Sequence, residues 1–233
     1  MNLDTQKHQA EFAHQLWTAV DDVVGHELCK EIADRARRLV ALHGFRDVDH
    51  GGSGSRYQLD GGGRYRFHLA DGLVVREHFC ELVAIYQVLR YWIGALTLYD
   101  VVMSPYRESD VTIQLYPPEG GTIGPHYDTN GITALLYLTS NGEGPLRMWP
   151  RNKDPWGDKN TETLAGEEPL EVFPKAGTIV LMEGRRLWHE SRPMETEDKV
   201  VVLFNYYVRG DVGRPDGFDS FIYHGLANER EHQ

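Results

Sequence analysis

Two histidines and an aspartate in this chain are spaced so that they could hold one metal ion. His126 and Asp128 stand two positions apart, and His189 follows 61 residues after the aspartate. In an extended strand, positions i and i+2 lie on the same face, so His126 and Asp128 can point toward one ion. A facing strand whose edge carries His189 could supply the third ligand.

Two imidazoles and one carboxylate leave three neighbouring positions of an octahedral ion open to reactants. Non-haem Fe(II) oxygenases bind their metal with this facial triad. The tripeptide His-x-Asp is by itself a weak signal, because a chain this rich in histidine contains one by chance about once. The signal is strengthened by apolar, β-branched runs at 178–182 and 200–208, which could be the strands that position His189.

The rest of the chain divides into a helical part and a β-rich part. Apolar residues recur at helical spacing over 28–43 and 77–93, and Gly94 is expected to end the second helix. Short β-rich runs follow, separated by turn residues, at 111–116, 132–139, 146–149, 170–173, 178–182 and 200–208. This pattern predicts a mixed α+β fold whose second half is a β-sandwich or barrel.

Length and composition fit one domain. A chain of 233 residues with 41% hydrophobic content can bury a sizeable core without a second one. We therefore expect a single domain over 1–233, with helical support at about 1–100, the β-rich core at about 110–210 and a C-terminal tail at 211–233.

Charge and cysteine usage narrow the partners and the compartment. The net charge of −11 repels phosphate backbones, so nucleic-acid partners are disfavoured. The chain has no run of about eighteen apolar residues and its first ten residues are polar, so we expect no membrane span and no secretory leader. Cys29 and Cys80 are expected to be buried free thiols. These features predict a cytoplasmic protein.

The motifs around the predicted ligands are similar to those of the Fe(II)/2-oxoglutarate-dependent dioxygenases, in particular the prolyl-4-hydroxylase-like branch. The resemblance covers roughly 114–208. The matching segments are Tyr116, His126-Tyr-Asp128, Ala134-Leu-Leu-Tyr137, Gly144-Pro-Leu146-Arg-Met-Trp-Pro150, Pro174-x-x-Gly177, His189-Glu and Lys199.

The resemblance implies both an architecture and a reaction. The implied fold is a double-stranded β-helix, or jelly roll, with the N-terminal helices packed on one sheet. His126, Asp128 and His189 would bind Fe(II), and 2-oxoglutarate and O2 would be co-substrates. The implied reaction is hydroxylation of a substrate C–H bond with release of succinate and CO2, although related enzymes can instead desaturate or cyclise.

Lys199 is the predicted partner of the distal carboxylate of 2-oxoglutarate, because the family places a cation ten residues after the second histidine. Lys199, Val201 and Leu203 share one face of a strand, so an inward Leu203 would carry Lys199 inward, and a buried lysine needs an anionic partner. The resemblance makes Tyr137 a hydrogen-bond donor to the same carboxylate, and we include Tyr116 and Leu135 in this pocket. The alternatives are a solvated lysine and a core tyrosine.

Asp128 bears on the outcome of the reaction. Related radical halogenases carry Gly or Ala in place of this carboxylate, so that chloride can bind the metal. The presence of Asp128 therefore disfavours halogenation.

Substrate selection in such a fold is expected from loops at the mouth of the barrel. We predict a loop at 45–67, mobile over its Gly-rich part at 51–63, whose arginines could grip a carboxylate or simply be exposed. Similarity to a bacterial group that hydroxylates or halogenates free amino acids implies Arg64 or Arg66 for that role and Asn205 for reading the substrate side chain. Many prolyl-hydroxylase-like relatives carry tryptophan in place of Asn205, which favours a more polar substrate. Glu108 and Gln114 are further candidates.

Three functions therefore remain open. The first is a 2-oxoglutarate oxygenase acting on a small molecule, such as a free amino acid or a natural-product intermediate. The second is a peptidyl-proline hydroxylase. The third is a metal-binding jelly roll without oxygenase activity, similar to a cupin, which would have no need of the Lys199–Tyr137 pair.

Overall fold

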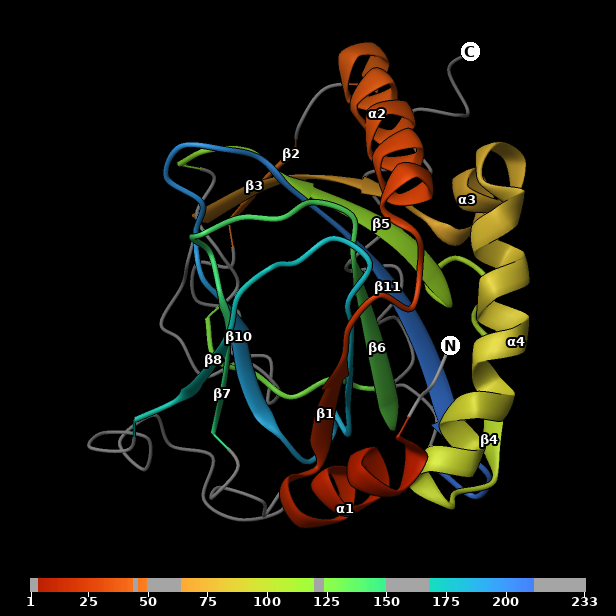
Figure 1. Ribbon diagram of the computed structural model, residues 1–233. Helices are drawn as coiled ribbons and strands as arrows, with labels where there is room; N and C mark the ends of the chain where they lie inside the picture. Colours follow the sequence, from red (N-terminus) through yellow and green to blue (C-terminus); the bar gives the residue numbers. More distant parts are fainter. Residues whose placement is uncertain (1–3, 44–45, 50–63, 120–123, 150–167, 212–233) are drawn as a thin grey trace.

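Two antiparallel β-sheets face one another, and helices cover the outer face of the larger sheet (Figure 1). The computed structural model describes residues 4–43, 46–49, 64–119, 124–149 and 168–211; of residues 43, 46–49 and 64–67 it describes the backbone alone. The predicted mixed α+β architecture, with helices on one sheet, is confirmed.

Four helices lie in the first hundred residues. They are α1 (Thr5–Gln15), α2 (His26–His43), α3 (Gly72–His78) and α4 (Cys80–Thr97). Asp71 caps α3, because its side chain accepts hydrogen bonds from the backbone N–H groups of Leu73 and Val74.

The larger sheet contains eight strands in the order β1-β9-β6-β11-β5-β3-β2, and β4 pairs with β11. Its strands are β1 (Trp17–Val20), β2 (Arg46–Asp49), β3 (Arg64–Ala70), β4 (Val101–Met103), β5 (Val111–Tyr116), β6 (Ile132–Tyr137), β9 (Ile179–Met182) and β11 (Lys199–Val208). The smaller sheet has the order β10-β7-β8, formed by β7 (Leu146–Trp149), β8 (Leu170–Val172) and β10 (Trp188–Ser191).

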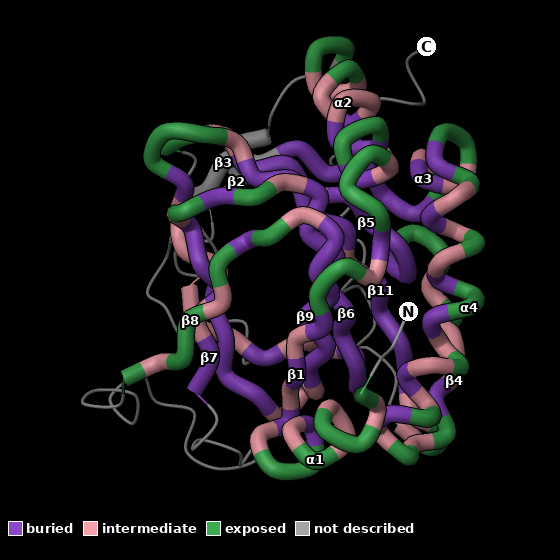
Figure 2. The backbone as a smooth tube through the Cα atoms, in the orientation of Figure 1, coloured by how far each residue is buried: buried purple, intermediate pink, exposed green. Residues whose placement is uncertain are grey.

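The strands β6, β9 and β11 of the larger sheet are buried on both faces, which is why they are nearly continuous apolar runs (Figure 2). On β11, Val200, Val202 and Phe204 pack against the helices, whereas Val201 and Leu203 belong to a second apolar cluster. That second cluster also contains Leu146, Met148 and Leu187, so it fills the space between the two sheets. Side chains that alternate with the helix-facing set thus point into the interior of the barrel.

The helix at 77–93 and the loop at 45–67 differ from their predictions. The break comes at the buried Phe79, which separates α3 from α4, and α4 continues past Gly94 to Thr97. Burial of Ile93 and Leu96 offsets the cost of about 1 kcal/mol for a helical glycine. Residues 46–49 and 64–67 are not loop but belong to β2 and β3, because pairing with each other and with β5 supplies backbone hydrogen bonds that local sequence does not signal. Residues 50–63 lie outside the described residues.

Two further observations concern membranes and cysteines. In the described part of the chain no single helix has the length and apolarity needed to cross a bilayer, and the pair α3 and α4, bent by 114°, meets that criterion only jointly, by length and composition. Both cysteines are free; Cys29 is buried, but Cys80 is exposed at the start of α4, so the prediction of burial was wrong for Cys80.

Candidate metal centre

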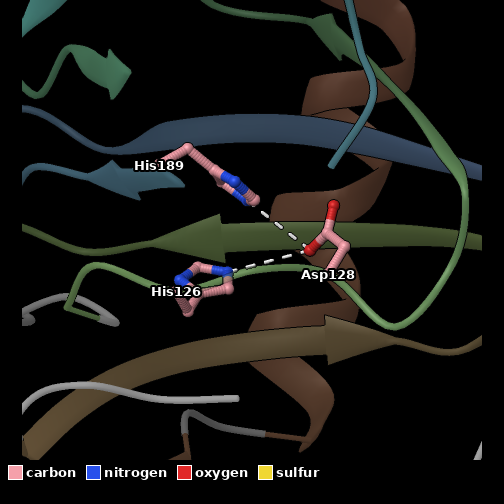
Figure 3. Close-up of side chains that lie close together, drawn as sticks. All are labelled: His126, Asp128 and His189. Atoms are coloured by element: carbon pink, nitrogen blue, oxygen red, sulfur yellow. Dashed lines mark ion pairs between the residues drawn. The ribbon is translucent and has the colours of Figure 1, made fainter. Parts of the chain in front are cut away.

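The structure brings His126, Asp128 and His189 together between the two sheets (Figure 3). Their ligand atoms all lie within 4.8 Å of one another. The Asp128 Oδ1 atom is 3.8 Å from His126 Nε2 and 3.5 Å from His189 Nε2. The three side chains therefore offer two imidazole nitrogens and one carboxylate oxygen to a common point.

Backbone pairing explains how residues 63 positions apart in sequence meet. His189 lies in β10, and its N–H donates to the His126 carbonyl at 3.2 Å, while the His126 N–H donates to the His189 carbonyl at 3.0 Å. This isolated bridge lies at the edge of the smaller sheet, beside β10. His126 and Asp128 are not in a regular strand, contrary to the strand geometry we predict from their spacing; a single bridge joins His126 to His189.

Hydrogen bonds fix which imidazole nitrogen faces the common point. His126 Nδ1 lies 2.8 Å from the Gly124 carbonyl, and His189 Nδ1 lies 2.9 Å from the Leu187 carbonyl. A carbonyl only accepts, so each Nδ1 carries the proton and donates it. In the neutral form of each imidazole, Nε2 is then the unprotonated nitrogen, and this is the form that binds a metal.

Asp128 is held from two sides. Its backbone N–H donates to the Gly184 carbonyl at 2.9 Å, and its Oδ2 accepts a hydrogen bond from the Thr133 hydroxyl. A Cβ atom at Gly184 would collide with the Asp128 carboxylate, so this position needs glycine for close approach. Sequence reasoning missed both Thr133 and Gly184, whose roles depend on contacts between separate elements.

Electrostatics favour an ionised carboxylate at the centre. Burial acts to raise the pKa of Asp128, but the neighbouring His189 and His126 imidazoles and the Thr133 hydroxyl hold it well below its usual range. Burial likewise acts to lower the pKa of His189, and the Asp128 charge raises it above its ordinary value. A divalent cation would take over the role of the positive partner of this carboxylate.

Lys199 lies in the interior at the start of β11 and is only 2% exposed. Its Nζ donates to the Ser191 hydroxyl at 2.6 Å, to the Gly144 carbonyl at 2.9 Å and to the Arg192 carbonyl at 3.3 Å. Gly144 has a positive φ of 61°, a conformation that favours glycine. Among the described residues no carboxylate pairs with this ammonium, and burial lowers the pKa of Lys199 to about 8.

The three other residues predicted for the 2-oxoglutarate pocket share the interior with Lys199. Tyr116 pairs with Lys199 across β5 and β11, and its ring centre is 5.2 Å from the Lys199 Nζ. Tyr137 and Leu135 lie on the interior face of β6. Burial raises the pKa of Tyr137, and among the described residues its hydroxyl has no hydrogen-bond partner.

The structure describes only some of the side chains predicted to contact the substrate. Asn205 is buried beside Thr133 in the β-ladder, and its Nδ2 donates to the Ser109 carbonyl at 2.6 Å. Arg64 and Arg66 lie in β3, but their side chains are outside the described part. Of the two further candidates, Glu108 is exposed, and Gln114 is half-buried and accepts a hydrogen bond from the Tyr116 hydroxyl.

The chemistry of the donor set fits a divalent transition metal. Two neutral imidazoles and one carboxylate are the ligands of the facial triad, which binds Fe(II) and leaves positions open for reactants. The carbonyls behind each Nδ1 and the hydroxyl behind Oδ2 complete the outer contacts that such ligands usually make.

Comparison with known proteins places this geometry in a known fold. No protein-family model and no curated protein sequence matches the chain. A prolyl-4-hydroxylase of Pseudomonas putida is similar in structure, with a TM-score of 0.59 and 18% identity over 88% of this chain and 100% of that chain. The α-ketoglutarate-dependent carbocyclase SnoK of nogalamycin biosynthesis gives 0.69 and 14% over 96% and 91%. HygX of Streptomyces hygroscopicus, solved with nickel, 2-oxoglutarate and hygromycin B, gives 0.61 and 13% over 88% and 88%.

At sequence identities of 13–18%, these comparisons establish the fold and nothing finer. The chain has the jelly-roll fold of the 2-oxoglutarate and Fe(II) oxygenases, including prolyl-4-hydroxylases. The predicted fold is therefore confirmed, and the similarity of structure covers 88% or more of the chain.

Proposed function

We propose that this chain is an Fe(II)- and 2-oxoglutarate-dependent oxygenase that hydroxylates an unactivated C–H bond of a small molecule. The observation that carries the proposal is the buried Lys199 ammonium, which has no carboxylate partner among the described residues. A buried charge without a counter-ion is costly, even where neutral groups accept its hydrogen bonds, so it implies an anionic ligand. A diacid that reaches from Lys199 to His126, Asp128 and His189 would serve both the ammonium and the metal centre.

In this proposal the residues of the site have separate roles. His126, Asp128 and His189 would hold Fe(II), which, when bound with 2-oxoglutarate and O2, supplies the oxidising chemistry. Lys199 would bind the distal carboxylate of 2-oxoglutarate by turning one of its three N–H donors from its present acceptors to the carboxylate, and the Tyr137 hydroxyl would donate to the same group. Overall, 2-oxoglutarate, O2 and substrate C–H give succinate, CO2 and substrate C–OH.

Apolar side chains around the pocket would exclude water from the reaction. Leu135, Val201 and Met182 lie in the interior cluster between the sheets, and all are buried. A dry wall strengthens the interaction between Lys199 and a carboxylate, because the local dielectric constant is low. The same wall would limit side reactions of the oxidant with solvent.

A metal-binding jelly roll without oxygenase activity accounts less well for these features. Such a protein requires the three ligands but has no use for a buried ammonium with a tyrosine hydroxyl on the adjacent strand. The Lys199 and Tyr137 pair therefore supports the oxygenase over the cupin-like alternative.

The choice of a small molecule over a peptide as substrate rests on Asn205 and on the solved structures that are similar to this chain. The Asn205 amide nitrogen is engaged by Ser109, so its oxygen is the atom that could accept a hydrogen bond from a polar substrate. HygX was solved with hygromycin B and SnoN with nogalamycin RO. Peptidyl proline is the second candidate, because a neighbouring prolyl hydroxylase from Trichoplax adhaerens was solved with a peptide fragment.

Succinate formation tests the proposal and the substrate class together. The protein would be incubated with Fe(II), 2-oxoglutarate and O2, first with a panel of free amino acids and amino-acid-derived intermediates and then with proline-rich peptides. We expect succinate release stimulated by a member of the small-molecule panel and absent in His189→Ala. Stimulation by peptides alone would favour the prolyl hydroxylase, and a wild-type protein that binds Fe(II) but never consumes 2-oxoglutarate would contradict the oxygenase.

A further inference from the structure

The two oxygens of the Asp128 carboxylate have different partners. Oδ1 faces both histidines, at 3.8 Å from His126 Nε2 and 3.5 Å from His189 Nε2. Oδ2 instead accepts the hydrogen bond from Thr133. Thr133 is 1% exposed and lies within β6, so the hydroxyl is presented from a rigid strand in the centre of the larger sheet.

Asn130 determines the direction of that hydrogen bond. Its Nδ2 donates to the Ile132 carbonyl and to the Thr133 Oγ1, both at 2.8 Å, and the side chain is 3% exposed. The contact with a carbonyl, which only accepts, requires the amide nitrogen at this position. The Thr133 oxygen therefore accepts from Asn130, and its single proton is left for Asp128 Oδ2.

We propose that Thr133, oriented by Asn130, is a positioning residue that keeps Asp128 a one-oxygen metal ligand. The inference rests on the proposed function. A carboxylate that binds through both oxygens would occupy four positions together with two histidines and leave two open in an octahedral site. A chelating diacid and O2 need three. By holding Oδ2 away, the Thr133 hydroxyl keeps the third position free.

Close packing behind the carboxylate supports this assignment. The Asp128 carboxylate lies against the Cα of Gly184, where even a methyl group would not fit, and the Asp128 N–H is bonded to the Gly184 carbonyl. Backbone contacts thus fix the position of the carboxylate, whereas the Thr133 hydroxyl forms a hydrogen bond with only one of its oxygens, Oδ2. Removal of the hydroxyl would leave Oδ2, on a half-buried side chain, without its hydrogen-bond donor and free to rotate toward the ion.

Binding of Co(II) and of 2-oxoglutarate tests the inference without turnover. Co(II) absorption bands report metal occupancy and coordination number, and a subsequent titration with 2-oxoglutarate gives its affinity. We expect Thr133→Val, which keeps the shape but lacks the hydroxyl, to bind Co(II) and to bind 2-oxoglutarate about 10- to 100-fold more weakly, the range in which outer contacts act at metal sites. Thr133→Ser, which keeps the hydroxyl, should match the wild type in both.

Asn130→Asp tests the direction of the proton separately. An aspartate there accepts from the Thr133 hydroxyl and turns its proton away from Asp128, so 2-oxoglutarate affinity should fall although the hydroxyl is present. Affinity is read only from the protein that binds Co(II), so partial unfolding lowers the stoichiometry and leaves the comparison intact. Unchanged affinity and unchanged Co(II) bands in Thr133→Val would overturn the inference. A wild-type protein that fails to bind Co(II) with 2-oxoglutarate would instead overturn the proposed function.

Discussion

Replacement of Lys199 by methionine removes the ammonium on which the 2-oxoglutarate site depends and keeps a side chain of similar length. In the wild type, Nζ is held by Ser191, Gly144 and Arg192, all within 3.3 Å, so it is fixed in place before any ligand arrives. The variant retains the three metal ligands. We therefore expect it to bind metal normally and to lose affinity specifically for the diacid.

The size of the loss follows from the burial of the pair. Lys199 is 2% exposed, so a bound carboxylate would be desolvated beside it. Breaking a buried ion pair by removing one partner costs about 3–5 kcal/mol, because the other charge is left uncompensated. At about 1.4 kcal/mol per factor of ten, the 2-oxoglutarate Kd should rise between about 100-fold and about 4,000-fold.

Isothermal titration of the Mn(II)-loaded protein with 2-oxoglutarate measures this change without turnover. Lys175→Met is the matched control, because Lys175 is exposed and its Nζ lies 2.8 Å from Asp21. The control should bind 2-oxoglutarate like the wild type. A Kd for Lys199→Met within about threefold of the wild type, well short of one 1.4 kcal/mol step, would refute the assignment of Lys199.

Three further outcomes are expected. Burial lowers the pKa of Lys199 in the folded chain to about 8, below its value of about 10.4 when unfolded. The free energy of unfolding of the ligand-free protein should therefore rise by about 3 kcal/mol in total as pH rises from below about 8 to above about 10.4. Urea unfolding should show this gain in the wild type and not in Lys199→Met, and equal gains would contradict it. Gly184→Ala should weaken Co(II) binding at least about tenfold, because its methyl group displaces the aspartate ligand, whereas Gly142→Ala, with open space around it, should bind normally; equal affinities would count against close approach at this site. Arg76→Met should lower the free energy of unfolding by about 3 kcal/mol, because it leaves the buried Asp110 unpaired; a loss under about 1 kcal/mol in denaturant titrations would mean that Asp110 is otherwise compensated.

Part of the candidate site could be found from sequence because two simple regularities lead to it. The separation of His126 and Asp128 by one residue indicated that their side chains could lie together, and they do, although the segment is not a strand. Alternation along a strand correctly placed Lys199 inside, since Val201 and Leu203 on the same face are apolar and interior.

The contacts that orient the centre could not be found in this way. The Thr133 hydroxyl, the Gly184 backbone and the Ser191 hydroxyl act through space, between elements whose register no local pattern specifies. The short strands β1 and β2 were missed for a related reason. Each forms because a partner strand completes its backbone hydrogen bonds.

The central claim, that one ferrous ion and one molecule of 2-oxoglutarate bind together at His126, Asp128 and His189, is tested most directly by anaerobic absorption spectroscopy. Addition of 2-oxoglutarate to the Fe(II)-loaded protein should produce a weak visible charge-transfer band that saturates at one equivalent and is absent from His126→Ala and His189→Ala. A protein that binds Fe(II) at these residues but gives no band with 2-oxoglutarate, or gives the same band in both variants, would contradict the claim.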